Sequence, residues 1–113
     1  MESSNHPVCD LGAFRCPDAT IHMRRALHEF AQNGTACFSL VSIEPSLPRS
    51  IEAILSQGDL HLQLESTDTR PITDEDREQW AAHFDEEDHE DCTQIRVFHF
   101  KSTATKNSGT TEF

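Results

Sequence analysis

Cys16 and Pro17 follow a predicted strand and its loop, at the start of a predicted helix, and they are the residues of this chain best placed to do chemistry. Proline suits the first position of a helix, because its missing N–H would have no partner there. The free N–H groups at a helix start carry partial positive charge, which favours thiolate over thiol. The pair therefore predicts an activated, nucleophilic sulfur, with a cysteine that merely fills a capping or core position as the alternative.

The other thiols and imidazoles form weaker patterns. Cys9 could approach Cys16 through the intervening loop as a second redox thiol, although a small strand residue is the simpler interpretation. Cys37 falls in a predicted central strand, where cysteine usually behaves as a buried hydrophobic residue. His22 lies on a different side of the same helix from Cys16, so we do not expect a Cys-His catalytic pair.

Metal and cofactor chemistry has little support in the sequence. His83, His89 and Cys92 have acidic neighbours, but their spacing matches no standard zinc pattern, and no C-x-x-C pair occurs. The sequence also shows no Gly-rich phosphate loop and no Ser-His-Asp set. We therefore predict no metal site and no cofactor.

The spacing of apolar residues predicts the elements that position Cys16. Within residues 17–33, apolar side chains recur every three or four positions, as on one face of a helix, and Gly34 follows as the expected stop. Ser46 is a candidate N-cap for the next helix, and Trp80 and Phe84 are spaced to anchor a third helix to the body. By such patterns we expect helices over residues 17–33, 47–57 and 73–84, and strands over residues 7–10, 36–43, 60–65 and 95–100.

These elements follow the order β-α-β-α-β-β, with the third helix inserted before the last strand. Two helices that cover one face of a four-stranded mixed sheet would form an α/β two-layer sandwich. We assign residues 1–101 to one domain, with an acidic insertion at residues 68–92 in which residues 85–91 form a solvated loop. Residues 102–113 are rich in Thr and Ser and are predicted to be a disordered tail.

Charge and composition narrow the classes of partner. The chain has 113 residues and a formal net charge of -11, which suits one small domain that repels phosphate backbones. A local basic patch at Arg15, Arg24, Arg25 and Arg49 is the exception, although an ordinary solvated helix face explains it as well.

No apolar run of membrane-spanning length and no signal-peptide pattern occur, and the four cysteines lack the dense spacing of a disulfide scaffold. We therefore expect a soluble, cytoplasmic protein with free thiols that binds neither nucleic acid nor membranes.

A resemblance to a known family starts at the Cys-Pro pair. Residues 10–27 resemble the start of the TusA (SirA-like) sulfur-carrier proteins and read D-L-G-A-F-R-C-P-D-A-T-I-H-M-R-R-A-L. That family carries a Cys-Pro-x-Pro motif at the start of its first helix, commonly preceded by Arg and followed by a basic residue one or two turns later. Residues 44–51 resemble the family's acidic-Pro turn, and the likeness covers roughly residues 8–66 and the last strand. The residues that match the motif are Arg15, Cys16, Pro17, Asp18 and Arg24.

The chain also departs from the family pattern. Ala19 replaces the second proline of the motif, and Ala13 stands where many members have glycine. The insertion at residues 68–92 has no counterpart in the short hairpin of typical members. These departures leave the expected fold largely intact, but they weigh against sulfur transfer to the usual partners of the family.

The resemblance implies that Cys16 accepts a sulfane sulfur as a persulfide and relays it to an acceptor protein, as a sulfurtransferase-like carrier. The donor would be a cysteine desulfurase or a rhodanese-like protein, and no cofactor is needed. Arg15 and Arg24 would add positive charge near the thiolate, and Pro17 would fix the geometry of the first turn. Two other hypotheses remain open: a non-catalytic interaction module whose acidic insertion binds a basic partner, and a redox sensor that uses Cys16 with Cys9.

Overall fold

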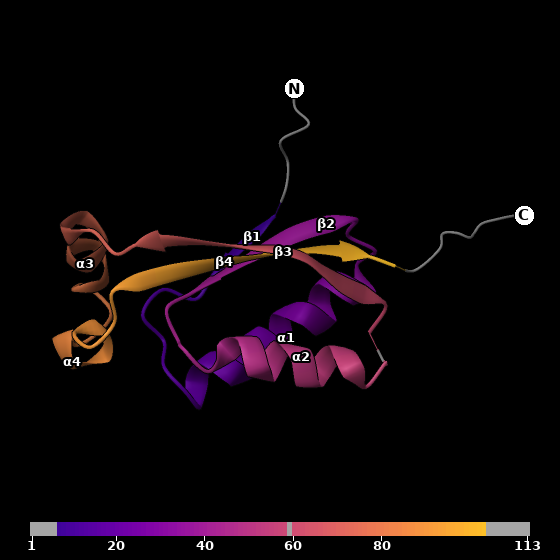
Figure 1. Cartoon of the computed structure of the whole chain (residues 1–113), viewed down its shortest axis with the longest axis horizontal. Helices are drawn as coiled ribbons and strands as arrows, with labels where there is room; N and C mark the ends of the chain where they lie inside the picture. Colours follow the sequence, from indigo (N-terminus) through magenta and orange to yellow (C-terminus); the bar gives the residue numbers. More distant parts are fainter. Residues whose placement is uncertain (1–6, 59, 104–113) are drawn as a thin grey trace, which may run out of the picture.

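A four-stranded sheet with two helices packed on one of its faces forms the body of the protein (Figure 1). The computed structural model describes residues 7–58 and 60–103. The predicted α/β two-layer sandwich is confirmed, with α1 and α2 as its helical layer. In chain order the elements are β1 (Val8–Asp10), α1 (Asp18–Gln32), β2 (Cys37–Ser42), α2 (Leu47–Ser56), β3 (Leu62–Pro71), α3 (Asp74–Trp80), α4 (Glu86–His89) and β4 (Gln94–Ser102).

The strands lie in the order β1-β2-β4-β3, so that β2 and β4 occupy the centre of the sheet. β1 runs parallel to β2, whereas β4 is antiparallel to both β2 and β3. A parallel pair needs a crossover connection, which α1 supplies here. The sheet is therefore mixed, as predicted, and the loop that carries Cys16 leaves the end of β1 and enters α1.

Apolar side chains from both layers meet in the main core between the helices and the sheet. Each helix buries a single stripe, in keeping with its amphipathic spacing. On the sheet, the rings of Phe38 and Phe100 stack with their centroids 4.9 Å apart. The large residues that are almost fully buried in this core are Met23, Leu27, Leu40, Leu47, Ile51, Phe38, Phe98 and Phe100.

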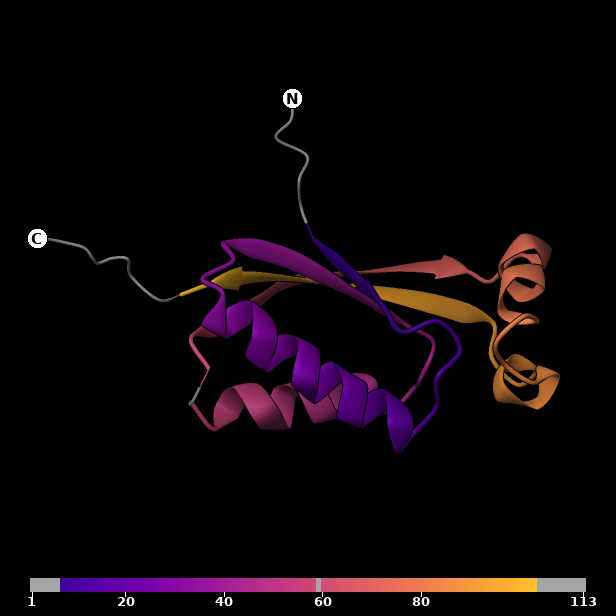
Figure 2. The ribbon, with the colours of Figure 1, turned by 180° about the vertical axis from the view of Figure 1, so that it is seen from behind.

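A second, smaller core joins the inserted helices to the body. Trp80 at the end of α3 and Phe84 just beyond it are partly buried, and the Phe84 ring meets Phe14 edge-on with centroids 4.9 Å apart. The anchoring predicted for these two aromatic residues is confirmed. Figure 2 shows α3 and α4 together at one end of the long β3–β4 pair. The buried residues of this second core are Ala13, Ile43, Cys92 and Ile95.

β3 is longer than the strand predicted over residues 60–65, and it includes residues 68–71 of the predicted insertion. Its second half is exposed and polar, so it lacks the apolar alternation that marks a strand in sequence. Backbone pairing with β4 holds it instead, with a shift of register between Leu64 and Ser66. β4 likewise extends through Ser102, beyond the domain end predicted at residue 101, while residues 104–113 of the predicted tail lie outside the described residues.

The acidic run at residues 85–91 contains a short helix, α4, where a solvated loop was predicted. Asp85 and Asp88 form a reciprocal capping box that satisfies backbone N–H groups at the start of α4. His89 is buried at its end, where Arg77 Nη1 lies 2.9 Å from its Nδ1 and donates to its backbone carbonyl. The capping pair was not predicted, because the high acidic content of residues 85–91 by itself predicts a solvated loop and not a capped helix.

Candidate functional site

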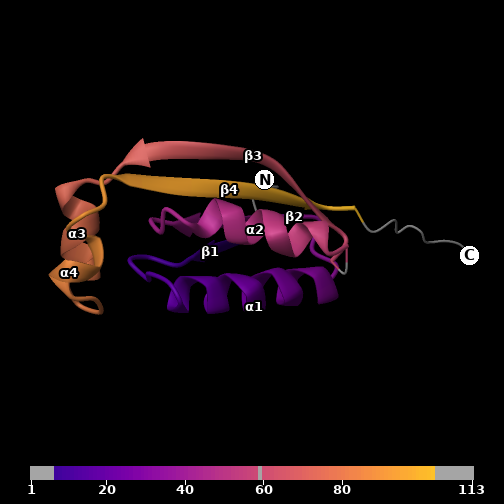
Figure 3. The same ribbon diagram turned by 60° about the horizontal axis from the view of Figure 1, so that its bottom comes forward.

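Cys16 lies in the loop before α1, with its side chain exposed. α1 begins at Asp18, so Pro17 is the N-cap and not the first helical residue, one position from the prediction. Figure 3 shows that α1 and α2 both begin at the end of the molecule where α3 and α4 lie. The thiol is therefore exposed beside a helix start, as the sequence predicted, and it lies near the start of a second helix as well.

Two hydroxyl groups flank the Cys16 sulfur. Thr20 Oγ1, in the first turn of α1, is 3.1 Å from Sγ, and Ser46 Oγ, just before α2, is 3.2 Å from it. Ser46 occupies the N-cap position of α2, but its side chain makes no capping hydrogen bond, contrary to the prediction. Its hydroxyl instead donates to the Glu44 carboxylate at 2.7 Å. In the turn before α2, the Ser46 hydroxyl therefore contacts Glu44 and the Cys16 sulfur and does not cap its own helix.

Glu44 connects the two helix starts. Its Oε1 accepts from the Cys16 N–H at 3.0 Å and from Arg15 Nε at 2.9 Å, and its Oε2 accepts from the N–H and the hydroxyl of Ser46. The residue is only 7% exposed. Burial alone would raise the pKa of Glu44, but the hydrogen bonds from Ser46, Cys16 and Arg15 outweigh it and lower the pKa to about 2. Glu44 is therefore a buried, ionised anchor for both loops.

Arg15 extends this network to the insertion. Its Nη1 donates to Asp91 Oδ1 at 2.7 Å and to the backbone carbonyl of Asp88 at 2.9 Å, while Nε binds Glu44. The hydrogen bond from Arg15 holds the pKa of Asp91 below its usual range. The positive charge expected near the thiolate is thus paired with two carboxylates, and the residue before Cys16 serves as a link between α4 and the thiol loop.

A hollow of about 580 Å³ opens beside the sulfur along α1. Arg24, the other predicted charged site residue, lines it, and Ile21 at its edge is 53% exposed. Among residues 7–58 and 60–103, neither Arg24 nor Arg25 makes an ion pair. The structure therefore brings Cys16, Pro17 and Arg24 together around one concave, cationic surface. Its lining residues are Cys16, Pro17, Thr20, Ile21, Arg24, Arg25 and His28.

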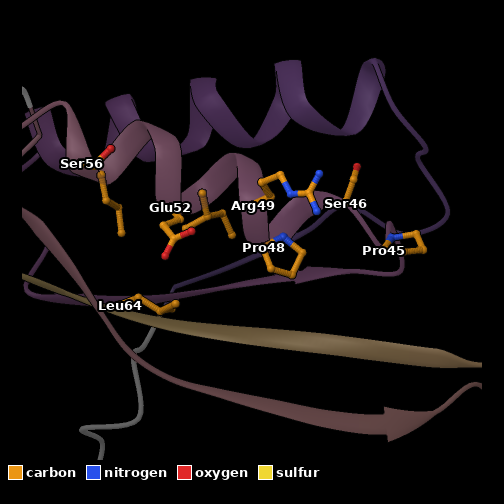
Figure 4. Close-up of a pocket in the computed structure, with 9 residues that line it drawn as sticks. Pro45, Ser46, Pro48, Arg49, Glu52, Ser56 and Leu64 are labelled. Atoms are coloured by element: carbon orange, nitrogen blue, oxygen red, sulfur yellow. The ribbon is translucent and has the colours of Figure 1, made fainter.

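A larger groove lies on the other side of Ser46, between α2 and β3 (Figure 4). Its volume is about 1020 Å³, and prolines, Leu55 and Leu64 give it an apolar floor. Arg49 on α2 also lines it and is free of ion pairs within the described part of the chain. Since Ser46 belongs to this groove and Cys16 to the hollow along α1, the sulfur lies between two concave surfaces.

The remaining cysteines occupy different surroundings, and all four thiols are free. Cys37 is exposed at the start of β2, so the prediction of a buried hydrophobic residue was wrong, because a strand terminus is less covered than its centre. Burial, together with Asp10 and Glu29, raises the pKa of the Cys9 thiol, which packs against the main core. This environment favours the interpretation of Cys9 as a small strand residue.

A hydrogen-bonded Ser-His-Asp arrangement is present that the sequence did not reveal. Ser39 Oγ is 2.8 Å from His99 Nδ1, and His99 Nε2 is 2.8 Å from Asp68 Oδ2. The three residues come from β2, β4 and β3, so their adjacency depends on strand pairing. Ser39 is only 2% exposed, so its hydroxyl is not open to a substrate, and the set ties the strands together on the face away from the helices.

Neither the residues of the predicted metal pattern nor His22 contributes to the candidate site around Cys16. Within the described residues, no group of three or more His, Cys, Asp and Glu side chains is arranged to hold a metal ion. His89 and Cys92 belong to the second core and its border, and the His22 ring lies against Phe14 with centroids 4.4 Å apart. The residues around the sulfur that were not predicted as site residues are Thr20, Glu44 and Ser46. For Glu44 and Ser46 the signal in the sequence was the acidic-Pro turn of residues 44–51 and the N-cap position of Ser46.

Comparison of the chain with models of protein families, with curated proteins and with solved structures finds no match. Within residues 7–58 and 60–103, no helix has both the length and the apolar content needed to cross a membrane. The structure thus shows an α/β two-layer sandwich. The geometry around Cys16 is the basis for a proposal about its function.

Proposed function

We propose that this protein is a sulfur carrier that accepts a sulfane sulfur on Cys16 and passes it to an acceptor protein. The observation that carries the proposal is the exposed Cys16 thiol, held at the meeting point of two helix starts beside an open hollow. The likeness of residues 10–27 to the TusA sulfur carriers gives the same function, with Arg15, Cys16, Pro17 and Arg24 as the matching residues. The cytoplasm is the expected compartment, because thiols stay reduced there.

The transfer is a sulfur exchange that needs no cofactor. The Cys16 thiolate attacks the outer sulfur of a donor persulfide, a new S–S bond forms at Cys16 Sγ, and the S–S bond of the donor breaks. The donor cysteine leaves as a thiolate, and the proton of the Cys16 thiol goes to solvent, so there is no net oxidation. The loaded Cys16 persulfide then gives its outer sulfur to a thiolate of the acceptor by the same step.

The hollow along α1 gives a basis for partner choice. The chain carries a net charge of -11, yet Arg24 and Arg25 lie unpaired beside Cys16 among the described residues. A donor or acceptor with an acidic surface around its own reactive sulfur would be attracted there and repelled by the acidic α3 and α4. Ile21, exposed at the edge of the hollow, offers an apolar contact. A cysteine desulfurase or a rhodanese-like protein of this character is the expected donor.

Sulfur loading tests the proposal directly. The full chain is incubated with a cysteine desulfurase and cysteine, or with inorganic polysulfide as a chemical donor, and intact and peptide masses are measured. We expect a gain of one sulfur atom on Cys16 that a reductant removes. Cys16→Ala abolishes this gain, whereas Cys37→Ala, which removes the other exposed thiol, leaves it unchanged. If Cys16→Ala accepts sulfur as readily as the parent from both donors, the carrier function is rejected.

A further inference from the structure

The two hydroxyls beside the Cys16 sulfur differ in where their hydrogens point. A serine hydroxyl has a single hydrogen to donate. Ser46 Oγ donates it to Glu44 Oε2 at 2.7 Å, and Glu44 is ionised at neutral pH because its pKa is about 2. Hydrogen bonds to a charged acceptor are about twice as strong as neutral ones. Ser46 therefore presents oxygen lone pairs, and no hydrogen, to the sulfur 3.2 Å away.

Thr20 is placed to do the opposite. Within the described part of the chain its hydroxyl contacts no carboxylate, and its Oγ1 lies 3.1 Å from Cys16 Sγ. Its hydrogen is free to turn to the sulfur and would stabilise a thiolate. Ser46, by contrast, can accept a hydrogen bond from a thiol but would set its lone pairs against a thiolate. The same sulfur thus has one neighbour that favours each protonation state.

Glu44 does not act as a base in this arrangement. Cys16, Ser46 and Glu44 are aligned as a relay, from thiol to hydroxyl to carboxylate. The pKa of Glu44 is about 2, so its carboxylate is a weak base that does not hold a proton near neutral pH. The carboxylate orients the Ser46 hydroxyl and does not take the proton.

We propose that Ser46, oriented by Glu44, is a positioning residue that holds the unloaded Cys16 sulfur as a hydrogen-bonding thiol, against the opposite influence of Thr20. This inference rests on the proposed carrier function and deepens it, because it describes which neighbour sets the reactivity of the carrier sulfur before loading. Once a persulfide forms, the charge resides on an outer sulfur about 2 Å beyond Sγ. The restraint therefore acts on the empty carrier and not on the loaded one.

Alkylation by iodoacetamide tests this without any sulfur donor. The thiolate bonds to the methylene carbon, iodide leaves and the thiol proton goes to solvent. Rates at Cys16 are measured by peptide mass spectrometry across pH in full-length parent, Ser46→Ala, Ser46→Thr and Thr20→Val proteins, with exposed Cys37 as the internal reference. One hydrogen bond predicts that Ser46→Ala reacts about two- to tenfold faster near neutral pH, with its pH profile displaced to lower pH. Thr20→Val is expected to move the profile to higher pH, and Ser46→Thr to follow the parent.

The direction of the displacement separates this role from simple access to the sulfur. A more open site in Ser46→Ala would raise the rate at all pH values without moving the midpoint of the profile. An unmoved midpoint, or a displacement in the same direction for Ser46→Ala and Thr20→Val, would overturn the proposal. If the profiles move as expected while Cys16 takes up no sulfur in the loading assay, the carrier function fails and the role of Ser46 stands. If Cys16 loads but the profiles do not move, the reverse holds.

Discussion

Cys16 and Cys92 lie at the two ends of one short network and have opposite surroundings. Arg15, which precedes Cys16, binds Asp91, which precedes Cys92. Cys16 is exposed between two hydroxyls and a cationic hollow, whereas Cys92 is 5% exposed and its Sγ lies 3.6 Å from the carbonyl oxygen of Ile43. Burial is the main reason that the pKa of the Cys92 thiol is raised.

The difference shows that charge nearby does not by itself make a cysteine reactive. The same guanidinium is a neighbour of both loops, yet it is bound by Glu44 and Asp91 and acts as a structural link. Exposure and hydrogen-bond partners separate the two thiols instead. The comparison leads to three predictions: which cysteine is alkylated faster, how much Glu44 stabilises the fold, and whether loss of the Arg15 link exposes Cys92.

The largest expected effect is in the relative reactivity of the two thiols. In native buffer we expect iodoacetamide to modify Cys16 at least about a hundredfold faster than Cys92, because Cys92 reacts only when the structure around it opens. Peptide mass spectrometry of partially alkylated protein measures both rates in one sample. In concentrated urea the two rates should converge. Comparable rates in native buffer would show that Cys92 is not protected and would remove the basis of the comparison.

The next effect concerns the carboxylate under the Cys16 loop. Glu44 has a folded-state pKa of about 2 against an ordinary value of 4.5, so its ionised form stabilises the fold above about pH 4.5, and this contribution is lost as pH falls towards 2. Replacing Glu44 by Gln should lower the free energy of unfolding at pH 7 by about 3 kcal/mol and flatten its decline between about pH 5 and 2. Urea unfolding at pH 7 and pH 3 measures both changes.

The matched control for this substitution is Glu52→Gln, which changes an exposed carboxylate of α2. It should alter the free energy of unfolding by no more than about 0.5 kcal/mol at either pH. Equal effects of the two substitutions would mean that the hydrogen bonds to Glu44 stabilise the fold no more than ordinary surface charge does.

The sequence predicted the parts of the fold that depend on apolar spacing. It predicted the buried stripe of α1 with Met23 and Leu27, the apolar centre of β2 and the end of the helix before Gly34. Buried positions recur with the period of the helix or strand, so their apolar residues form a pattern in the sequence. The second half of β3 and the helix α4 have no such apolar pattern. They are polar and, apart from His89 and the half-buried Asp88 in α4, exposed. Strand pairing holds the one and capping hydrogen bonds hold the other, and composition indicates neither.

Of the candidate site, the sequence predicted Cys16, Pro17 and Arg24, which the structure places together, but not the hydrogen-bond partners around the sulfur. Cys16 and Pro17 mark a helix start on their own, since that signal is local. The contacts of Glu44 with Cys16 join residues 28 apart in the chain, and those of Arg15 with Asp91 join residues 76 apart. Such partners are set by how the loops pack after folding, so no spacing rule points to them. Knowing that β1 and β2 are parallel neighbours would have placed the loops after these strands together, and with them Cys16 and Glu44.

The smallest expected effect concerns the link between the two cysteines. Lysine in place of Arg15 keeps the positive charge but loses the planar fork that binds Glu44 and Asp91 at the same time. We expect Arg15→Lys to loosen the insertion, so that Cys92 is alkylated about two- to tenfold faster, while the rate at Cys16 stays within about twofold of the parent. Hydrogen exchange of the amides in α4 should accelerate in parallel. Arg24→Lys, the same exchange at an exposed residue of the hollow, should leave Cys92 and α4 at parental rates. If Arg15→Lys leaves the protection of Cys92 intact, the second core alone holds the insertion, and the two thiols are independent of each other.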